Sequence, residues 1–130
     1  MKLIDGKDIA KKIEEEIKAV LAPSPSNSPS GRGRKSGLAV ILVGDNSASQ
    51  IYVKKKEEAA KRVGIKFQKI LFPIPNTQYL IPNTKQLEKK IISKIEDLNK
   101  DKNITGIIVQ LPLPAGLDTN KIIAAIDPKK

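Results

Sequence analysis

Acid–base chemistry in this 130-residue chain must rely on Lys, Tyr, Asp or Glu, because the sequence contains no His and no Cys. The lack of Cys excludes disulfides and thiolate nucleophiles. A transition-metal site would then have to be built from carboxylates alone, which is not the usual chemistry of such sites. We therefore expect no bound metal and look for a proton-transfer group among the lysines, tyrosines and carboxylates.

One lysine differs from the other charged residues of segment 47–63, which has the pattern of a helix. Most charges there have a potential partner of opposite sign three or four positions away, as Lys61 has in Glu57. Lys56 has none, and at 3.6 residues per turn it lies within about 40° of Tyr52 on the apolar stripe. Two interpretations stay open. The amine reaches solvent above a packed stem, or it serves as a general acid or base beside a phenol.

The elements that would position Lys56 alternate between helix and strand patterns. Apolar residues at helical spacing predict helices over 7–21, about 47–63, about 84–98 and about 119–126. Either Ser47 or Ser49 could cap the second helix. Apolar runs predict strands over 38–43, 65–72 and 104–111. This order predicts an α/β fold in three layers: a parallel sheet with a βαβαβ core, helices on both faces and an extra N-terminal helix.

Two segments are expected at the ligand-binding edge of this sheet. Ligands of open parallel sheets bind beyond the carboxyl ends of the strands, and these ends are followed here by residues 44–49 and 110–114. Gln110 closes an otherwise apolar strand, and its amide needs hydrogen-bond partners. The amine of Lys56 could be one of them.

Two further segments are not expected to form helices or strands. Segment 23–37 is rich in Pro, Ser and Gly and holds a basic cluster at 32–35, so we expect a flexible exposed loop. Segment 73–84 contains Ile-Pro-Asn-Thr twice.

The formal charge of +10 is divided equally between the two halves of the sequence, and aromatic residues make up only 3% of it. We expect neither a nucleic-acid nor a membrane partner, since the longest apolar run, 38–43, is far too short for a transmembrane helix.

Two motifs carry a resemblance to a known family. Val-Gly-Asp-Asn-Ser-Ala-Ser-Gln-Ile-Tyr-Val-x-x-Lys at 43–56 and Gly-Ile-Ile-Val-Gln-Leu-Pro-Leu-Pro at 106–114 resemble motifs of the methylenetetrahydrofolate dehydrogenase/cyclohydrolase family. The opening Leu-Ile-Asp-Gly-Lys at 3–7 matches as well. The resemblance runs along residues 1–130 and implies the N-terminal catalytic domain of that family. The family's Asp-Val-Asp-Gly stretch and its NADP-binding domain are not in this sequence.

The resemblance implies an activity and a role for each matching residue. The activity is interconversion of 5,10-methylene-, 5,10-methenyl- and 10-formyl-tetrahydrofolate, with NADP as the cofactor of the complete enzyme. That enzyme would be a cytoplasmic homodimer. Lys56 would be the acid/base of methenyl-tetrahydrofolate hydrolysis, Tyr52 would line the site and stack near the pterin, and Gln110 would orient the amine. The remaining substrate-binding residues would be Ser49, Val109 and Leu111.

Three functional hypotheses follow. The first is the catalytic half of a folate-dependent one-carbon enzyme. The second is a folded part of that enzyme that is inactive alone or needs a partner. The third, of a different class, is a basic anion-binding or RNA-binding module that uses the cluster from Arg32 to Lys35.

Overall fold

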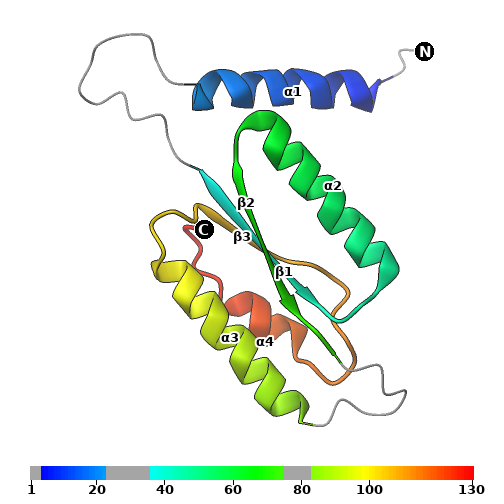
Figure 1. Ribbon diagram of the computed structural model, residues 1–130, viewed down its shortest axis with the longest axis vertical. Coiled ribbons are helices and arrows are strands. Elements are labelled where there is room, and N and C mark those ends of the chain that lie inside the picture. Colours follow the sequence, from blue (N-terminus) through cyan, green and yellow to red (C-terminus); the bar gives the residue numbers. More distant parts are fainter. Residues whose placement is uncertain (1–3, 23–35, 75–82) are drawn as a thin grey trace.

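The computed structural model describes residues 4–22, 36–74 and 83–130, which form an open parallel sheet with helices on both faces (Figure 1). The strands are β1 (Gly37–Val43), β2 (Lys66–Phe72) and β3 (Gly106–Val109), in the order β2-β1-β3. The helices are α1 (Gly6–Leu21), α2 (Ser47–Val63), α3 (Thr84–Lys100) and α4 (Thr119–Ala124). The predicted α/β class is thus confirmed.

Strand β1 lies at the centre of the sheet, and this explains its uninterrupted apolar sequence. Residues 39–43 are all buried, because successive side chains point to opposite faces and both faces are covered. Ile41 belongs to the larger core cluster, together with Ile91 and Ile95 of α3 and Ile122 of α4. Val40 belongs to a smaller cluster with Val53 of α2. Helix α2 therefore covers one face, and α3 and α4 cover the other (Figure 1).

The ends of the helices have identifiable causes. Helix α2 begins after Asn46, whose side chain accepts a hydrogen bond from the backbone N–H of Ser49 at 2.9 Å. The prediction of Ser47 or Ser49 as the cap was wrong, because Asn is an equally good cap and lies where the strand turns into the helix. Gly64 ends α2 with φ of 85°, a left-handed conformation that favours glycine.

Two predicted elements differ from the observed ones. Strand β3 covers only residues 106–109, rather than 104–111. Its pairing with β1 ends at Val109, and the prolines beyond have no N–H to donate. The apolar stripe of α1, expected from its helical spacing, contributes no buried residue. Helix α1 is instead tied to α2 by a two-pronged ion pair, in which Arg62 binds Glu14 with Nη2 to Oε1 at 2.8 Å.

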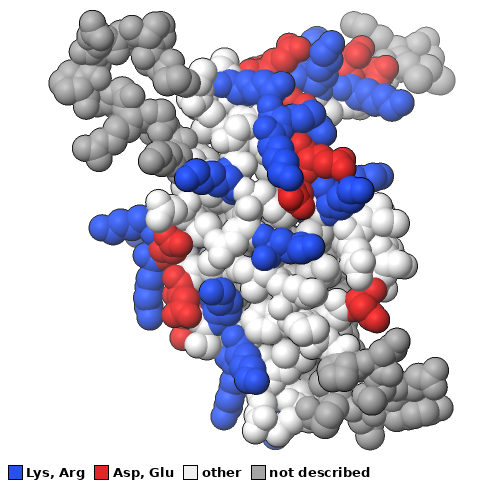
Figure 2. All heavy atoms as spheres, viewed as in Figure 1, with Lys and Arg blue, Asp and Glu red and all other residues white. Residues whose placement is uncertain are grey.

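Charged side chains are dispersed over the surface. On the face in Figure 2, Lys and Arg alternate with Asp and Glu over much of the molecule rather than forming one basic patch. The basic cluster at 32–35 and the repeat at 74–84 fall largely outside the described residues. In the three described segments no helix is long and apolar enough to cross a bilayer.

Candidate functional site

Lys56, Tyr52 and Gln110 come together near the carboxyl ends of β1 and β3. The amine Nζ of Lys56 donates a hydrogen bond to Oε1 of Gln110 at 3.0 Å, across 54 residues of sequence. The same Nζ lies 5.7 Å from the centre of the Tyr52 ring, within the range of a cation–π contact. Lys56 is half-buried, whereas the Tyr52 ring, at 57% exposure, borders open solvent. The Lys56 amine is therefore held between a phenol and an amide.

Local structure explains this position. Tyr52 and Lys56 are one turn apart on α2, and they lie beside the buried stripe of Ser49, Val53 and Ala60 rather than within it. Gln110 directly follows β3, and its backbone N–H still donates to the carbonyl of Ile41 at 2.9 Å. This bond holds Gln110 at the sheet edge, next to the flank of α2.

The amide of Gln110 has one orientation that satisfies both of its neighbours. A lysine amine can only donate, so it must face the amide oxygen. The amide Nε2 in turn donates to the backbone carbonyl of Leu111 at 2.7 Å. Because the side-chain amide of Gln110 is neutral, the Lys56 amine is fixed in place without an opposing carboxylate. Two of its three N–H donors remain for another group.

The other residues predicted from the sequence to bind substrate differ in how exposed their side chains are. Val109 is buried in the core, so its side chain is not open to a ligand. Leu111 is 44% exposed and lies beside Gln110. Ser49 is 2% exposed, because it lies on the buried stripe of α2. In this structure Ser49 is therefore not open to a ligand in the way that Tyr52 is.

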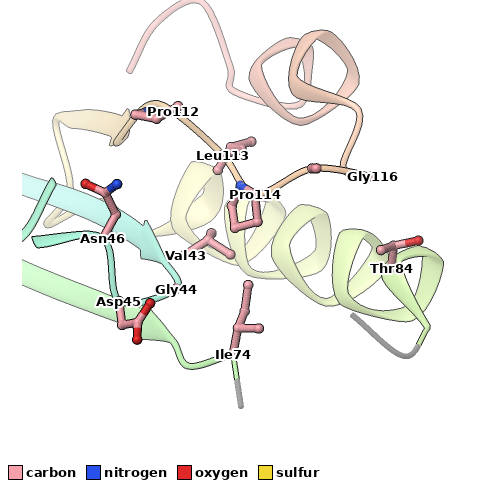
Figure 3. Close-up of a pocket in the computed structure, with 11 residues that line it drawn as sticks. Val43, Gly44, Asp45, Asn46, Ile74, Thr84, Pro112, Leu113, Pro114 and Gly116 are labelled. Carbon is pink, nitrogen blue, oxygen red and sulfur yellow. The ribbon is translucent and has the colours of Figure 1, made fainter. Parts of the chain in front are cut away.

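A cavity of about 640 Å³ opens at the same edge of the sheet (Figure 3). It lies where the two predicted edge segments meet, with Pro114 near Gly44, and it is lined mainly by apolar groups. Val43, Ile74 and Pro114 point toward one another across it (Figure 3). Lys56 and Tyr52 do not line it. The candidate catalytic group therefore does not lie in the wall of this cavity.

The sequence pattern did not single out two of the residues in this wall. Ile74 follows β2 and Thr84 begins α3, and both line the same cavity although they are ten residues apart in the sequence. No spacing rule connects them. Asn46, also in the wall, belongs to segment 44–49, which the sequence analysis expects at this edge of the sheet.

Cofactor and metal chemistry can be tested against these residues. Within residues 4–22, 36–74 and 83–130, no cluster of acidic residues could hold a metal ion. The turn from β1 to α2 has one glycine, Gly44, and lacks the glycine-rich spacing that lets a backbone approach a pyrophosphate. The turn from β1 to α2 therefore lacks the pattern that is typical of a dinucleotide site.

Comparison with known proteins agrees with the motifs. Residues 4–130 match the model of the family described as tetrahydrofolate dehydrogenase/cyclohydrolase, catalytic domain. The chain belongs to this family. The bifunctional protein FolD of Ruthia magnifica is 46% identical over 130 residues, which are all of this chain and 40% of that protein. The chain thus spans about two fifths of the length of the curated relatives it matches.

Solved structures of family members have the same fold. The FolD methylenetetrahydrofolate dehydrogenase/cyclohydrolase of Campylobacter jejuni has a TM-score of 0.81 and 38% identity, over 100% of this chain and 41% of that one. The Trypanosoma brucei enzyme has a TM-score of 0.78 and 28% identity, over 99% of this chain and 39% of that one. The latter was solved with NADP cofactor and an inhibitor.

Proposed function

We propose that this chain carries the acid–base site of a folate-dependent one-carbon enzyme, with Lys56 as the general acid/base. The reaction assigned to the site is the interconversion of 5,10-methenyl- and 10-formyl-tetrahydrofolate. The observation that carries the proposal is the hydrogen bond from Lys56 to Gln110, beside the exposed ring of Tyr52. Family membership supports the substrate class, since the matching family model is that of tetrahydrofolate dehydrogenase/cyclohydrolase.

The chemistry requires a proton to be moved twice. Water attacks the cationic carbon between the two nitrogens of the methenyl group, a C–O bond forms, and the water loses a proton. The hydroxyl then loses its remaining proton as the carbonyl forms, the bond from this carbon to one ring nitrogen breaks, and that nitrogen keeps the electron pair and takes up a proton. A neutral Lys56 amine that accepts one of the water protons and, as the ammonium, delivers it to the nitrogen serves both steps, and the other water proton is released to solvent. Gln110 would hold the amine in place, and the Tyr52 ring would cover one side of the substrate.

The remaining expectations concern the complete protein. We propose that it also oxidises 5,10-methylene-tetrahydrofolate with NADP, which is bound by residues outside this chain. A cytoplasmic homodimer is part of the same proposal. The use of NADP is supported by a relative that was solved with it, and the binding residues outside this chain are supported by relatives about two and a half times as long.

The test is optical measurement of methenyl-tetrahydrofolate hydrolysis by the 130-residue chain and by a full-length counterpart. In the full-length protein, Lys56→Met should lower kcat by about 10²–10⁴-fold, the usual contribution of a general acid or base. Lys55→Met is the matched control, because Lys55 is the adjacent residue on α2 and is exposed. It should retain activity. Circular dichroism and urea unfolding check that both variants fold.

Retention of activity by Lys56→Met would refute the mechanism. Gln110→Leu is a second test of the mechanism, because leucine has a similar side-chain size but lacks the oxygen that accepts the hydrogen bond from the Lys56 amine. A role in positioning predicts a fall in kcat of about 10–100-fold, corresponding to one hydrogen bond to a charged group. Substrate KM should change far less.

A second candidate function is a catalytic half that works only with another polypeptide segment. The exposure of Tyr52 and Leu111 favours it, since groups that contact a substrate are usually more enclosed. Calorimetry with a folate ligand separates the two candidates. Binding and turnover by the 130-residue chain support the first. Binding or turnover only in the full-length protein supports the second.

A further inference from the structure

Strand β2 forms one edge of the sheet and is paired on one side only, with β1 (Figure 1). At its two ends, the N–H of Lys66 and the carbonyl of Phe72 bond to the residues that flank β1, each at 2.9 Å. Because backbone groups alternate in direction along a strand, residues 67, 69 and 71 turn their N–H and C=O groups outward. In the described segments of the chain these outward groups have no hydrogen-bond partner.

A groove of about 590 Å³ runs beside this open edge, between α2 and β2. Ile51 of α2 and Leu71 of β2 line it and are 56% and 50% exposed. Lys54 and Lys69 line it as well, one from each element. Strand alternation places Lys69 and Leu71 on the same face as Phe67, which packs against the core cluster under α2. The outward backbone groups and the groove therefore belong to one continuous surface.

The charge of this groove calls for an acidic partner. Lys54 and Lys69 are exposed, and neither forms an ion pair within residues 4–22, 36–74 and 83–130. Glu57, the acidic residue among those that line the groove, is already bound to Lys61 at 2.8 Å. Two ammonium groups thus border an apolar floor. A lysine on an edge strand also disfavours pairing with another basic strand, so it selects for an acidic one.

We propose that the β2 edge and this groove form a docking site for an extended segment of another polypeptide, on which apolar and acidic side chains share one face. The segment adds a strand beside β2 and bonds to the outward backbone groups. Its acidic side chain lies between Lys54 and Lys69, and its apolar side chains lie against Ile51 and Leu71. A second copy of β2 fits less well, because antiparallel pairing centred on Lys69 brings two lysines together.

The proposal is independent of the folate chemistry. Lys54 and Lys56 lie on different sides of α2, since two residues turn a helix by about 200°. The docking site uses neither Lys56 nor the groups that contact it.

The first test is amide hydrogen exchange, measured by NMR on the intact 130-residue chain at low and high concentration. The amides of residues 67, 69 and 71 should exchange roughly tenfold faster than those of residues 68, 70 and 72, a difference corresponding to about one hydrogen bond. Protection of the first set at every concentration would rule out the proposal, because the chain itself would then cover the edge. Protection only at high concentration would also rule it out, in favour of a second copy.

The second test is titration with the capped peptide Thr-Val-Thr-Glu-Thr-Val-Thr, which has its valines and glutamate on one face. Amide shifts should centre on residues 67, 69 and 71. Lys69→Glu should weaken binding by roughly tenfold, and a peptide with Lys in place of Glu should restore it. Lys66→Glu is the matched control, because Lys66 lies on the same strand but on its other face, and it should bind like the wild type. Circular dichroism and urea unfolding check that both variants fold.

Backbone pairing is tested with the same peptide, N-methylated either at its threonines or at its valines and glutamate. The two sets of N–H groups point to opposite edges of the peptide strand, and only one set can face β2. One methylated peptide should therefore bind and the other should not. Equal binding by both, equal effects of Lys66→Glu and Lys69→Glu, or no shifts in the wild type at millimolar peptide would each overturn the proposal.

Discussion

Gly37, the first residue of β1, lies so close to the segment before β3 that a side chain at this position would test the packing between them. A Cβ added at this position would overlap the carbonyl oxygen of Asn103 and lie 3.1 Å from its carbonyl carbon. Both are backbone atoms, so no side chain can rotate out of the way. The carbonyl of Gly37 also accepts hydrogen bonds from the N–H and the hydroxyl of Thr105, at 2.7 and 3.1 Å. Alanine must therefore displace β1 from the segment before β3.

We expect Gly37→Ala to lower the free energy of unfolding by about 3 kcal/mol. This sum combines overpacking, about 1–3 kcal/mol, with the weakening of hydrogen bonds worth about 1 kcal/mol each. Gly106→Ala is the matched control in β3, since its added Cβ would meet only Leu38 Cδ1 at 3.5 Å, an ordinary contact. It should change stability by less than about 1 kcal/mol. The assay is urea unfolding followed by circular dichroism. Equal stability of the two variants would refute this account of the packing.

Two further predictions concern the contacts of α3 with the C-terminal segment. The side chain of Asn99 donates a hydrogen bond to the carbonyl of Ala125 at 2.8 Å and accepts one from the N–H of Asp127 at 3.0 Å. Asn99→Ala should therefore lower the free energy of unfolding by about 2 kcal/mol, measured by urea unfolding. An unchanged unfolding midpoint would show that these bonds contribute nothing to stability. Lys121, and secondarily the N–H of Asp118, hold the pKa of Glu88 below its ordinary value of 4.5. The stability that this contributes is present above that value and is lost as the pH falls through the lower folded pKa. The stability difference between wild type and Glu88→Gln should therefore shrink between pH 7 and pH 3, and a constant difference would contradict the assignment.

Much of the fold could be predicted because burial on two faces leaves a clear pattern. The run 38–43 has no polar residue since β1 is covered on both sides, and the helical spacing in α2 and α3 follows from their single buried faces. Element boundaries were less predictable. Ile104 is buried and apolar like a strand residue, yet it precedes β3, because strand pairing depends on the neighbouring strand rather than on burial.

The candidate site also has features that the sequence pattern predicts and features that it does not. Lys56 could be singled out from the sequence because every other charge tested on α2 has a potential partner within one turn. The sequence did not indicate that Arg62 would choose Glu14 on α1 instead of Glu58 on its own helix. Such a choice depends on the distance between helices, which local spacing does not contain.

The sequence by itself determined the α/β class, the order of the elements and the unusual position of one lysine, because these follow from periodicity and charge spacing along a single chain. Only the tertiary structure decided that the amine of Lys56 meets the amide of Gln110, that Ser49 is closed off, and that the stripe of α1 stays half exposed. These outcomes depend on how surfaces distant in sequence pack together, and that packing is a property of the assembled molecule.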